Sequence, residues 1–331
     1  MRTIVTGAAG FIGSHLCERL LADGHDVIAV DRLTPYYDPE VKRANLALFA
    51  DHPRAEVVLQ DVSSPAMLGR LREVDTVFHL AAQPGVRPSW TSFSTYLREN
   101  VERVHALLEA ARTVGETGRA PRIVLASSSS VYGEALHYPC AEQDATAPVS
   151  PYGVSKLTME RLASAYVDAY ALPIVSLRYF TVYGPRQRPD MAFHSFIRAA
   201  LTGEPVAVYG DGEQVREFTF VEDVVEATVR AGSRELPPGT TVNVCGGEPT
   251  TVNGVLALLG ELTGSPVRVV HQPPATGDVR RTGGSTELAA SVLGWEPSTS
   301  LRVGLARQVA WHLAVEAARR ARSAAAVRVP G

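Results

Sequence analysis

The stretch that decides the fold is Thr6-Gly7-Ala8-Ala9-Gly10-Phe11-Ile12-Gly13. It joins a short apolar run, residues 2–6, to an amphipathic run, residues 11–22, that Gly24 follows. The first run predicts a strand and the second a helix. Glycines at such a junction let the backbone turn tightly and approach a pyrophosphate, which the free N–H groups at the helix start can bind. The spacing is Gly-x-x-Gly-x-x-Gly rather than the commoner Gly-x-Gly-x-x-Gly, and a tight turn without a ligand is the alternative. We expect cofactor contacts from Gly7, Gly10, Phe11, Ile12 and Gly13.

Strands and helices alternate along the first 180 residues. Further strands are predicted at residues 26–30, 57–59, 76–80, 122–126 and 174–178, and helices at 65–72, at 95–114 (ended by Gly115) and from Pro151 onward. This alternation predicts a parallel sheet with helices on both faces. We therefore expect a Rossmann-type, doubly wound α/β domain over residues 1–180, which also receives roughly residues 217–245.

The pattern changes after residue 180, where proline, glycine and arginine become frequent and the elements shorter. Helices are predicted at 193–202, 221–231 and 301–322, and strands at 206–208, 217–220 and 241–244, of which the last can rejoin the main sheet. Residues 181–216 and 246–322 are expected to form a smaller α/β substrate domain. Residues 323–331, rich in alanine and arginine, are expected to be a frayed tail.

Composition narrows the function classes. The 331 residues have 45% hydrophobic and 20% charged side chains, which is typical of a soluble globular protein. A net charge of -3 offers no basic field for nucleic acid. Three distant cysteines indicate reduced thiols and no zinc site. The first strand leaves no room for a signal peptide and no apolar run could span a membrane, so we expect a cytoplasmic protein without a metal.

Two lysines, Lys42 and Lys156, stand among 30 arginines. Lys156 lies four residues after Tyr152, a spacing that puts both side chains on one face of a helix. A cation beside a phenol favours the phenolate and lowers the tyrosine pKa from about 10 toward neutrality. Tyr152 is therefore a candidate acceptor for the proton of an alcohol that is being oxidised. The alternative is an exposed helical pair without a function.

Acidic residues follow two predicted strands. Asp31 ends the second strand, where a carboxylate can accept hydrogen bonds from an adenosine ribose and repel a 2'-phosphate, which favours NAD over NADP. Arg32 comes next and weakens that preference. Asp61-Val62 ends the third strand, where the acid could bond the adenine amino group or, alternatively, cap a helix.

Together these segments, with His79-Leu80-Ala81-Ala82 and Asn100, resemble the extended short-chain dehydrogenase/reductases over nearly the whole chain, and within them the nucleotide-sugar epimerases, dehydratases and decarboxylases. The resemblance implies a tightly held NAD that takes a hydride from the sugar and can return it, and a homodimer through residues 95–114 and 152–170. Tyr96, Leu107, Leu108 and Tyr166 could serve that interface or the core. It further implies Tyr152 as base, Lys156 as its electrostatic partner, Ser128 as a bridging hydroxyl, and contacts to the cofactor site from Leu80, Ala81, Ala82 and Asn100.

Ser128-Ser129-Ser130 narrows the choice within the family. The dehydratases have Asp and Glu at the second and third of these positions, and the UDP-glucuronate decarboxylases have Glu at the third. A serine hydroxyl cannot replace a carboxylic acid as a general acid at neutral pH. Epimerisation needs no such acid, because the sugar is oxidised, turned over and reduced on its other face.

The segment from Arg178 to Met191 resembles UDP-glucuronate 4-epimerases, and Gln83 to Arg87 is similar to them except at Pro84. Arginine forks bind carboxylate and phosphate. We assign Arg188 to the sugar carboxylate, helped by the hydroxyls of Thr181, Ser128 and Ser129. The other expected UDP-sugar ligands, of which Arg87 and Arg186 are less certain, are Arg87, Arg186, Arg216, Asp278 and Arg280.

The leading hypothesis is thus a UDP-glucuronate 4-epimerase. An epimerase of a neutral UDP-hexose is the nearest alternative, and a UDP-glucuronate decarboxylase comes third. A non-catalytic NAD-binding module would be expected if Tyr152 or Lys156 were absent, and both are present.

Overall fold

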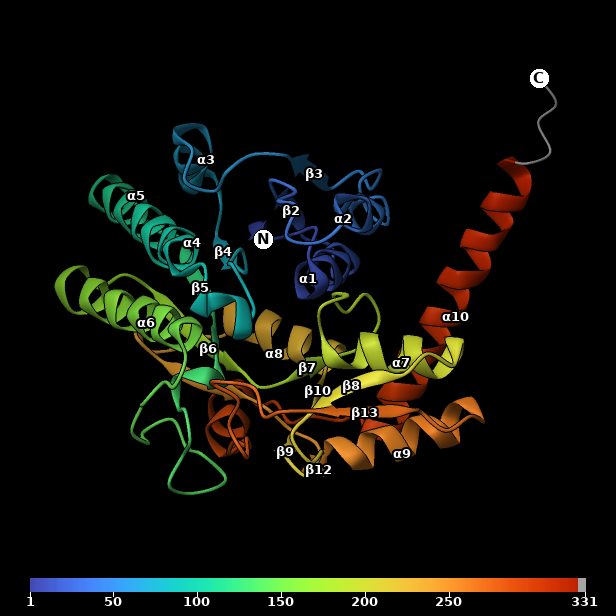
Figure 1. The fold of residues 1–331 in the computed structure, drawn as a ribbon. Coiled ribbons are helices and arrows are strands. Elements are labelled where there is room, and N and C mark those ends of the chain that lie inside the picture. Colours follow the sequence, from blue (N-terminus) through green and yellow to red (C-terminus); the bar gives the residue numbers. More distant parts are fainter. Residues whose placement is uncertain (327–331) are drawn as a thin grey trace.

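Seven parallel strands form the main sheet of the computed structural model, which describes residues 1–326 (Figure 1). Their order is β11-β6-β5-β4-β1-β2-β3. The strands are β1 (Arg2–Thr6), β2 (Asp26–Val30), β3 (Ala55–Val58), β4 (Thr76–His79), β5 (Arg122–Ser128), β6 (Ile174–Tyr179) and β11 (Thr241–Val244). The predicted Rossmann-type sheet is confirmed, and β11 rejoins it beside β6 as expected.

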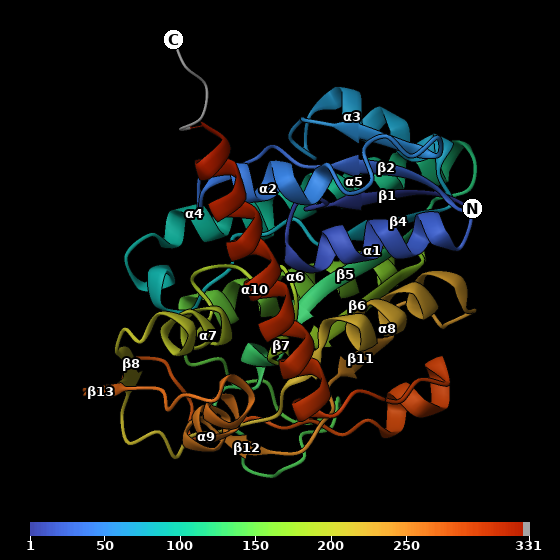
Figure 2. The same ribbon diagram turned by 90° about the vertical axis from the view of Figure 1, so that its right-hand side faces the viewer.

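Helices cover both faces of this sheet because alternate strand residues point to opposite sides. Val5 packs in one core with residues of α1 (Phe11–Ala22) and α8 (Val221–Ser233), which lie side by side in Figure 2. Its neighbour Ile4 packs in a second core with α5 (Arg103–Thr117) and α6 (Pro151–Tyr170). The remaining helices beside the sheet are α2 (Pro39–Leu46), α3 (Pro65–Gly69) and α4 (Phe93–Leu97).

The helix predicted at residues 95–114 is longer and less regular. It begins as α4, passes through a π-helical segment at residues 98–102 and continues as α5 to Thr117. Gly115 lies inside α5, and the chain leaves the helix at Gly118 instead. The four side chains considered for a dimer interface, Tyr96, Leu107, Leu108 and Tyr166, are buried within the single chain. They serve its own core, and the homodimer stays a prediction.

The C-terminal part adds three two-stranded sheets. They pair β7 (Val182–Tyr183) with β10 (Thr219–Phe220), β9 (Val215–Arg216) with β12 (Thr250–Thr251), and β8 (Val206–Tyr209) with β13 (Val269–Gln272). Its helices are α7 (Ala192–Thr202), α9 (Val252–Thr263) and α10 (Leu301–Ala326). The single strand predicted at 217–220 is wrong in its bounds: strand β9 ends at Arg216 and β10 covers Thr219–Phe220, while between them the Glu217 carboxylate accepts a hydrogen bond from the Gly284 N–H at 2.8 Å.

One hydrophobic core runs from this part into the face of the main sheet, since Phe193, Phe218 and Leu305 belong to the same cluster as Val5. The division into two domains stays a prediction. Helix α10 continues to Ala326, and residues 327–331 of the expected frayed tail lie outside the described residues. Within residues 1–326, no helix has the length and apolar character needed to cross a bilayer.

Candidate active site

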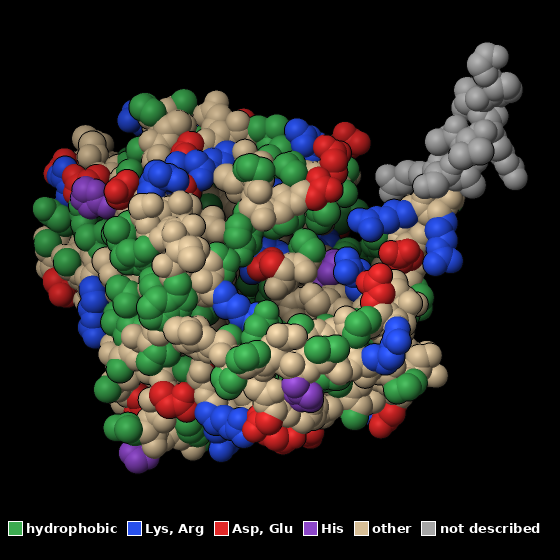
Figure 3. Space-filling view, viewed as in Figure 1, with side chains coloured by type: hydrophobic (Ala, Val, Ile, Leu, Met, Phe, Trp, Pro, Cys, Tyr) green, Lys and Arg blue, Asp and Glu red, His purple; other side chains and the backbone are tan. Residues whose placement is uncertain are grey.

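A cavity of about 400 Å³ opens at the carboxyl ends of the central strands. The register places Thr6 opposite both Val30 and His79, so the residues that follow β1, β2 and β4 meet at one edge. Figure 3 shows the surface hollowed there, between the part of the molecule that carries the main sheet and the part that carries α7, with cationic side chains in the hollow. This is the place where ligands bind in open α/β sheets.

The glycine-rich turn forms one wall of the cavity. Gly7 has φ +71°, a conformation that favours glycine. A Cβ on Gly13 would lie 2.1 Å from the Gly7 carbonyl oxygen, so only glycine fits this contact. Helix α1 begins after Gly10 with no side chain capping its N–H groups. These free donors face the cavity with Phe11 and Ile12, and the turn fits the pyrophosphate of a dinucleotide.

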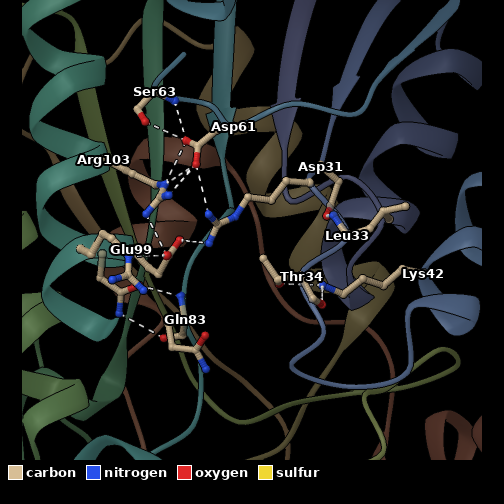
Figure 4. Close-up of polar contacts among 12 residues, drawn as sticks. Asp31, Leu33, Thr34, Lys42, Asp61, Ser63, Gln83, Glu99 and Arg103 are labelled. Atoms are coloured by element: carbon tan, nitrogen blue, oxygen red, sulfur yellow. Dashed lines mark hydrogen bonds and ion pairs between the residues drawn. The ribbon is translucent and has the colours of Figure 1, made fainter. Parts of the chain in front are cut away.

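Charged side chains line the far end of the cavity, where the adenosine of a dinucleotide was expected. Asp31 accepts hydrogen bonds from the backbone N–H groups of Ala9 and Leu33, at 3.2 and 2.7 Å. Asp61 is held by the Arg103 guanidinium, whose Nε lies 2.9 Å from both carboxylate oxygens (Figure 4). That guanidinium keeps the pKa of Asp61 well below its usual range. Asp61 caps no helix, because Ser64 caps α3.

The remaining predicted cofactor residues divide into two groups. Val62, Leu80, Ala81 and Ala82 line the cavity. Asn100 does not: it is buried behind the wall, where its side chain pairs with the backbone of Gln83 and donates to the Ser155 hydroxyl at 3.0 Å. Asn100 therefore holds the cavity wall against α6, which agrees with the expectation that it supports the site, and its contact with the cofactor stays a prediction.

Tyr152 and Lys156 lie together in the cavity, on the first turns of α6. Lys156 is buried, and its ammonium donates to the Ala126 carbonyl at 2.7 Å. Burial lowers the pKa of Lys156 to about 8, while the Glu160 carboxylate raises it. Burial also raises the pKa of Tyr152, which Ser128 and the Arg188 guanidinium partly oppose. The expectation that Lys156 lowers the pKa of Tyr152 is therefore not met, because desolvation dominates and the cation that acts on the phenol is Arg188.

The expected sugar end is lined by hydroxyl groups and one guanidinium. Ser128, Ser129, Ser130 and Thr181 all border the cavity, and no carboxylic acid stands in the serine triplet. Arg188 borders it too and forms a double hydrogen bond with Asp190, at 2.9 and 3.0 Å. Tyr36, from the segment after β2, donates to the same carboxylate at 3.3 Å. This hydrogen bond links the expected sugar end of the cavity to the segment after β2, at the expected nucleotide end.

A second cavity contains the other predicted substrate residues. Asp278 and Arg280 line it, and the Arg216 guanidinium bonds Asp278 at 2.5 Å. The Arg280 guanidinium pairs with Asp211 at 2.8 Å. Arg87 connects the two cavities, because it follows Gly85 and Val86 of the first and its guanidinium lies 3.7 Å above the ring of Tyr209 in the second.

Arg186 does not lie where the sequence predicts it. It borders neither cavity, and its guanidinium packs against α1, where it pairs with Glu18 at 2.6 Å and contacts His15. Its backbone has φ +64°, an uncommon conformation for a residue other than glycine. Arg186 ties the loop that carries Arg188 to helix α1, and it is not a substrate ligand.

Sequence reasoning missed several lining residues, including Tyr36, Lys42, Glu99 and Arg103. Lys42 is buried and donates to the carbonyl and the hydroxyl of Thr34, at 2.9 and 3.1 Å. The scarcity of lysine could have identified it, since Lys42 is one of two in the chain. Glu99 and Arg103 had no such signal. In residues 1–326, no three His, Cys, Asp or Glu side chains gather as metal ligands do.

Comparison with known proteins agrees with this geometry. Residues 3–245 match the model of the NAD dependent epimerase/dehydratase family. An uncharacterized UDP-glucose epimerase, YtcB of Bacillus subtilis, is 40% identical over 94% of this chain and 98% of its own. A UDP-glucuronic acid 4-epimerase from Bacillus cereus, solved with UDP-glucuronic acid and NAD, superposes with a TM-score of 0.90 at 35% identity, over 95% of this chain and 100% of its own. MoeE5, solved with NAD and either UDP-glucuronic acid or UDP-glucose, is 43% identical with a TM-score of 0.85, over 95% of this chain and 99–100% of its own.

Proposed function

This chain belongs to the NAD-dependent epimerase/dehydratase family, and from that premise we propose that it interconverts UDP-glucuronate and UDP-galacturonate. At the coarser level it is an NAD-dependent UDP-sugar 4-epimerase, as its relatives are. The observation that carries the finer proposal is the position of Arg188, which borders the same cavity as Tyr152 and is the cation that acts on its phenol.

The residues present fit NAD. The glycine turn admits a pyrophosphate without a Cβ in the way, and Asp31 stands where a ribose hydroxyl would donate. When bound, NAD would supply the acceptor for the hydride of the sugar C4 and the donor for its return to the opposite face.

The Tyr152 hydroxyl would accept the proton of the C4 alcohol and give it back. Its pKa is raised by burial in the protein alone, so the phenolate needs nearby positive charge. Arg188 supplies part of that charge. Lys156 binds the end of β5 through the hydrogen bond from its ammonium to the Ala126 carbonyl. The Ser128 hydroxyl, which accepts from the Ser130 N–H at 3.2 Å, is positioned to bridge the phenol and the sugar.

Arg188 would hold the sugar carboxylate, with the hydroxyls of Thr181, Ser128 and Ser129 as additional partners. This contact has a chemical purpose. Oxidising C4 of glucuronate makes a β-keto acid, which loses carbon dioxide when the bond to the carboxylate lies perpendicular to the carbonyl plane. A fork of donors that fixes the carboxylate away from that geometry protects the intermediate. The absence of an acid at Ser129 and Ser130 supports epimerisation over dehydration or decarboxylation.

A neutral UDP-hexose is the second candidate, and the Arg188–Asp190 pair favours it. Two donors of the guanidinium are already used at 2.9 and 3.0 Å, and the Asp190 carboxylate would repel a second carboxylate nearby. MoeE5, a relative that has been solved with UDP-glucuronic acid and with UDP-glucose, is consistent with either candidate.

Proton NMR of purified protein incubated with each UDP-sugar distinguishes the candidates. The proposal expects UDP-galacturonate from UDP-glucuronate, with a kcat/KM at least about 10-fold above that for UDP-glucose, since a carboxylate–arginine contact is worth about 1.5–3 kcal/mol. Equal or better turnover of UDP-glucose would contradict it.

Arg188→Met tests the residue itself. We expect kcat/KM for UDP-glucuronate to fall by about 100-fold, because the bound sugar carboxylate loses the guanidinium that pairs with it. We also expect UDP-pentose and carbon dioxide to appear. Arg198→Met, which removes an exposed guanidinium from α7, is the matched control and should leave turnover unchanged. Unchanged epimerisation by Arg188→Met, with no pentose, would remove Arg188 from the carboxylate site.

A further inference from the structure

Arg32 stands where it could undo the cofactor preference set by Asp31. A guanidinium at the end of the second strand of this fold can bind the 2'-phosphate that distinguishes NADP from NAD. Arg32 borders the cavity immediately after Asp31. Its side chain, however, already has two partners: Asp61 at 3.1 Å and Glu99 at 2.6 Å.

Glu99 is the more buried of these partners, with 9% of its side chain exposed against 28% for Asp61. It comes from the π-helical segment between α4 and α5, on the wall opposite β2. Its two carboxylate oxygens bind different arginines, Arg32 at 2.6 Å and Arg103 at 2.8 Å. The exposed Arg98 lies 3.3 Å away on the same side. In Figure 4, Glu99 and Asp61 lie on either side of Arg103.

Two acids, Asp61 and Glu99, and two arginines, Arg32 and Arg103, pair with one another, and the exposed Arg98 contacts only Glu99 of these four. Arg103 is secured to Asp61 by several contacts, including both carboxylate oxygens at 2.9 Å, whereas Arg32 reaches Asp61 through one contact at 3.1 Å. Loss of Glu99 would leave both arginines with Asp61 alone. Arg103 is also the less exposed, at 14% against 36%, so Arg32 is the one that would be released.

We propose that Glu99 is a specificity-determining residue for the cofactor. Its ion pair with Arg32 keeps that guanidinium from binding the 2'-phosphate of NADP. Asp31 repels that phosphate, and Glu99 removes the cation that would otherwise compensate. The preference for NAD thus depends on two acids from separate parts of the chain. The inference concerns dinucleotide binding alone and does not depend on which sugar is turned over.

The test measures which dinucleotide the protein retains. Each purified variant is exchanged against equimolar NAD and NADP and freed of unbound dinucleotide. Acid then releases the bound dinucleotide, and mass spectrometry gives the NADP:NAD ratio. Glu99→Gln should raise this ratio by about 10- to 100-fold over wild type, because a charge-assisted contact becomes available. Glu102→Gln removes the same charge from an exposed position three residues away and should leave the ratio at the wild-type value.

Arg32→Ala completes the cycle. In the Glu99→Gln background, Arg32→Ala should return the NADP:NAD ratio to within about twofold of wild type. On its own, Arg32→Ala should also leave the ratio within about twofold of wild type, because a guanidinium paired with Glu99 makes no contact with the dinucleotide. An unshifted ratio for Glu99→Gln, or a shift that survives Arg32→Ala, would overturn the proposal. If Glu99→Gln does not fold, the single Arg32→Ala decides: a ratio that falls about tenfold means that Arg32 already binds the phosphate.

Discussion

The two ends of the main cavity are held together in different ways. At the end where we expect the adenosine, Arg32, Arg103, Asp61 and Glu99 pair with one another at 2.5–3.1 Å. At the end where we expect the sugar, hydroxyl groups dominate, and the charged pair is Arg188 with Asp190. The charged side chains of the first end therefore hold one another in place, whereas the second end has few fixed partners for its ligand.

This difference agrees with what an epimerase must do. The cofactor has to stay in one place, while the keto sugar has to turn over and present its other face. Paired charges in a partly buried site resist rearrangement, because separating them leaves an unpaired charge. Hydroxyl groups can donate or accept, so they can serve two orientations of one sugar.

The largest effect should come from Tyr152→Phe at the sugar end. Removing the phenolic oxygen takes away the proton acceptor, and we expect kcat to fall by about 10⁴-fold, while bound NAD stays at its wild-type amount. NMR of the sugar and mass spectrometry of released dinucleotide measure the two quantities. Wild-type activity would exclude Tyr152 as the base, and loss of NAD would show that the two ends are not separable.

The next effect should come from the glycine turn. Gly13→Ala would place a Cβ 2.1 Å from the Gly7 carbonyl oxygen, a clash with backbone that overpacking data put at about 3 kcal/mol. We expect the affinity for NAD to fall by about 100-fold, so that the purified variant retains less NAD. We also expect a lower unfolding temperature. Gly69→Ala is the control, because nothing lies within 4 Å of its Cβ position. Full NAD content in Gly13→Ala would show that the turn is not the pyrophosphate site.

The third effect, which is spread over several pH units and is therefore the smallest at each step, concerns the pH dependence of stability. Burial lowers the pKa of Lys156 from 10.5 to about 8, so between these values the unfolded chain holds a proton that the folded chain lacks. The free energy of unfolding of wild type should therefore rise with pH in this window, by about 1.4 kcal/mol per pH unit from this group, and the buried charge should cost most below pH 8.

Urea unfolding of NAD-free protein from pH 7.5 to 10.5 measures this, with Lys156→Met as the reference that lacks the titration. The difference in unfolding free energy between wild type and Lys156→Met should rise in favour of wild type as the pH increases. A flat difference would mean that Lys156 is not desolvated in the folded protein.

Local patterns predicted the elements and their edges where one strong signal dominated. The glycines placed the start of α1, and the i, i+4 spacing placed Tyr152 and Lys156 in one cavity. Prediction failed where a single side chain has several possible partners. Arg186 and Arg188 are two residues apart in one arginine-rich segment, yet Arg186 pairs with Glu18 of α1 whereas Arg188 borders the cavity.

The sequence by itself determined the parallel α/β sheet, the glycine-rich turn and the shared helix face of Tyr152 and Lys156, because each depends on neighbours within a few positions along the chain. Tertiary structure alone decided which charges pair. Asp61 and Arg103 are 42 residues apart and Tyr36 and Asp190 are 154 apart, and each pair meets only because the sheet brings distant loops to one edge. Pairing and burial set the electrostatics of the site, and neither can be calculated until the partners have positions in space.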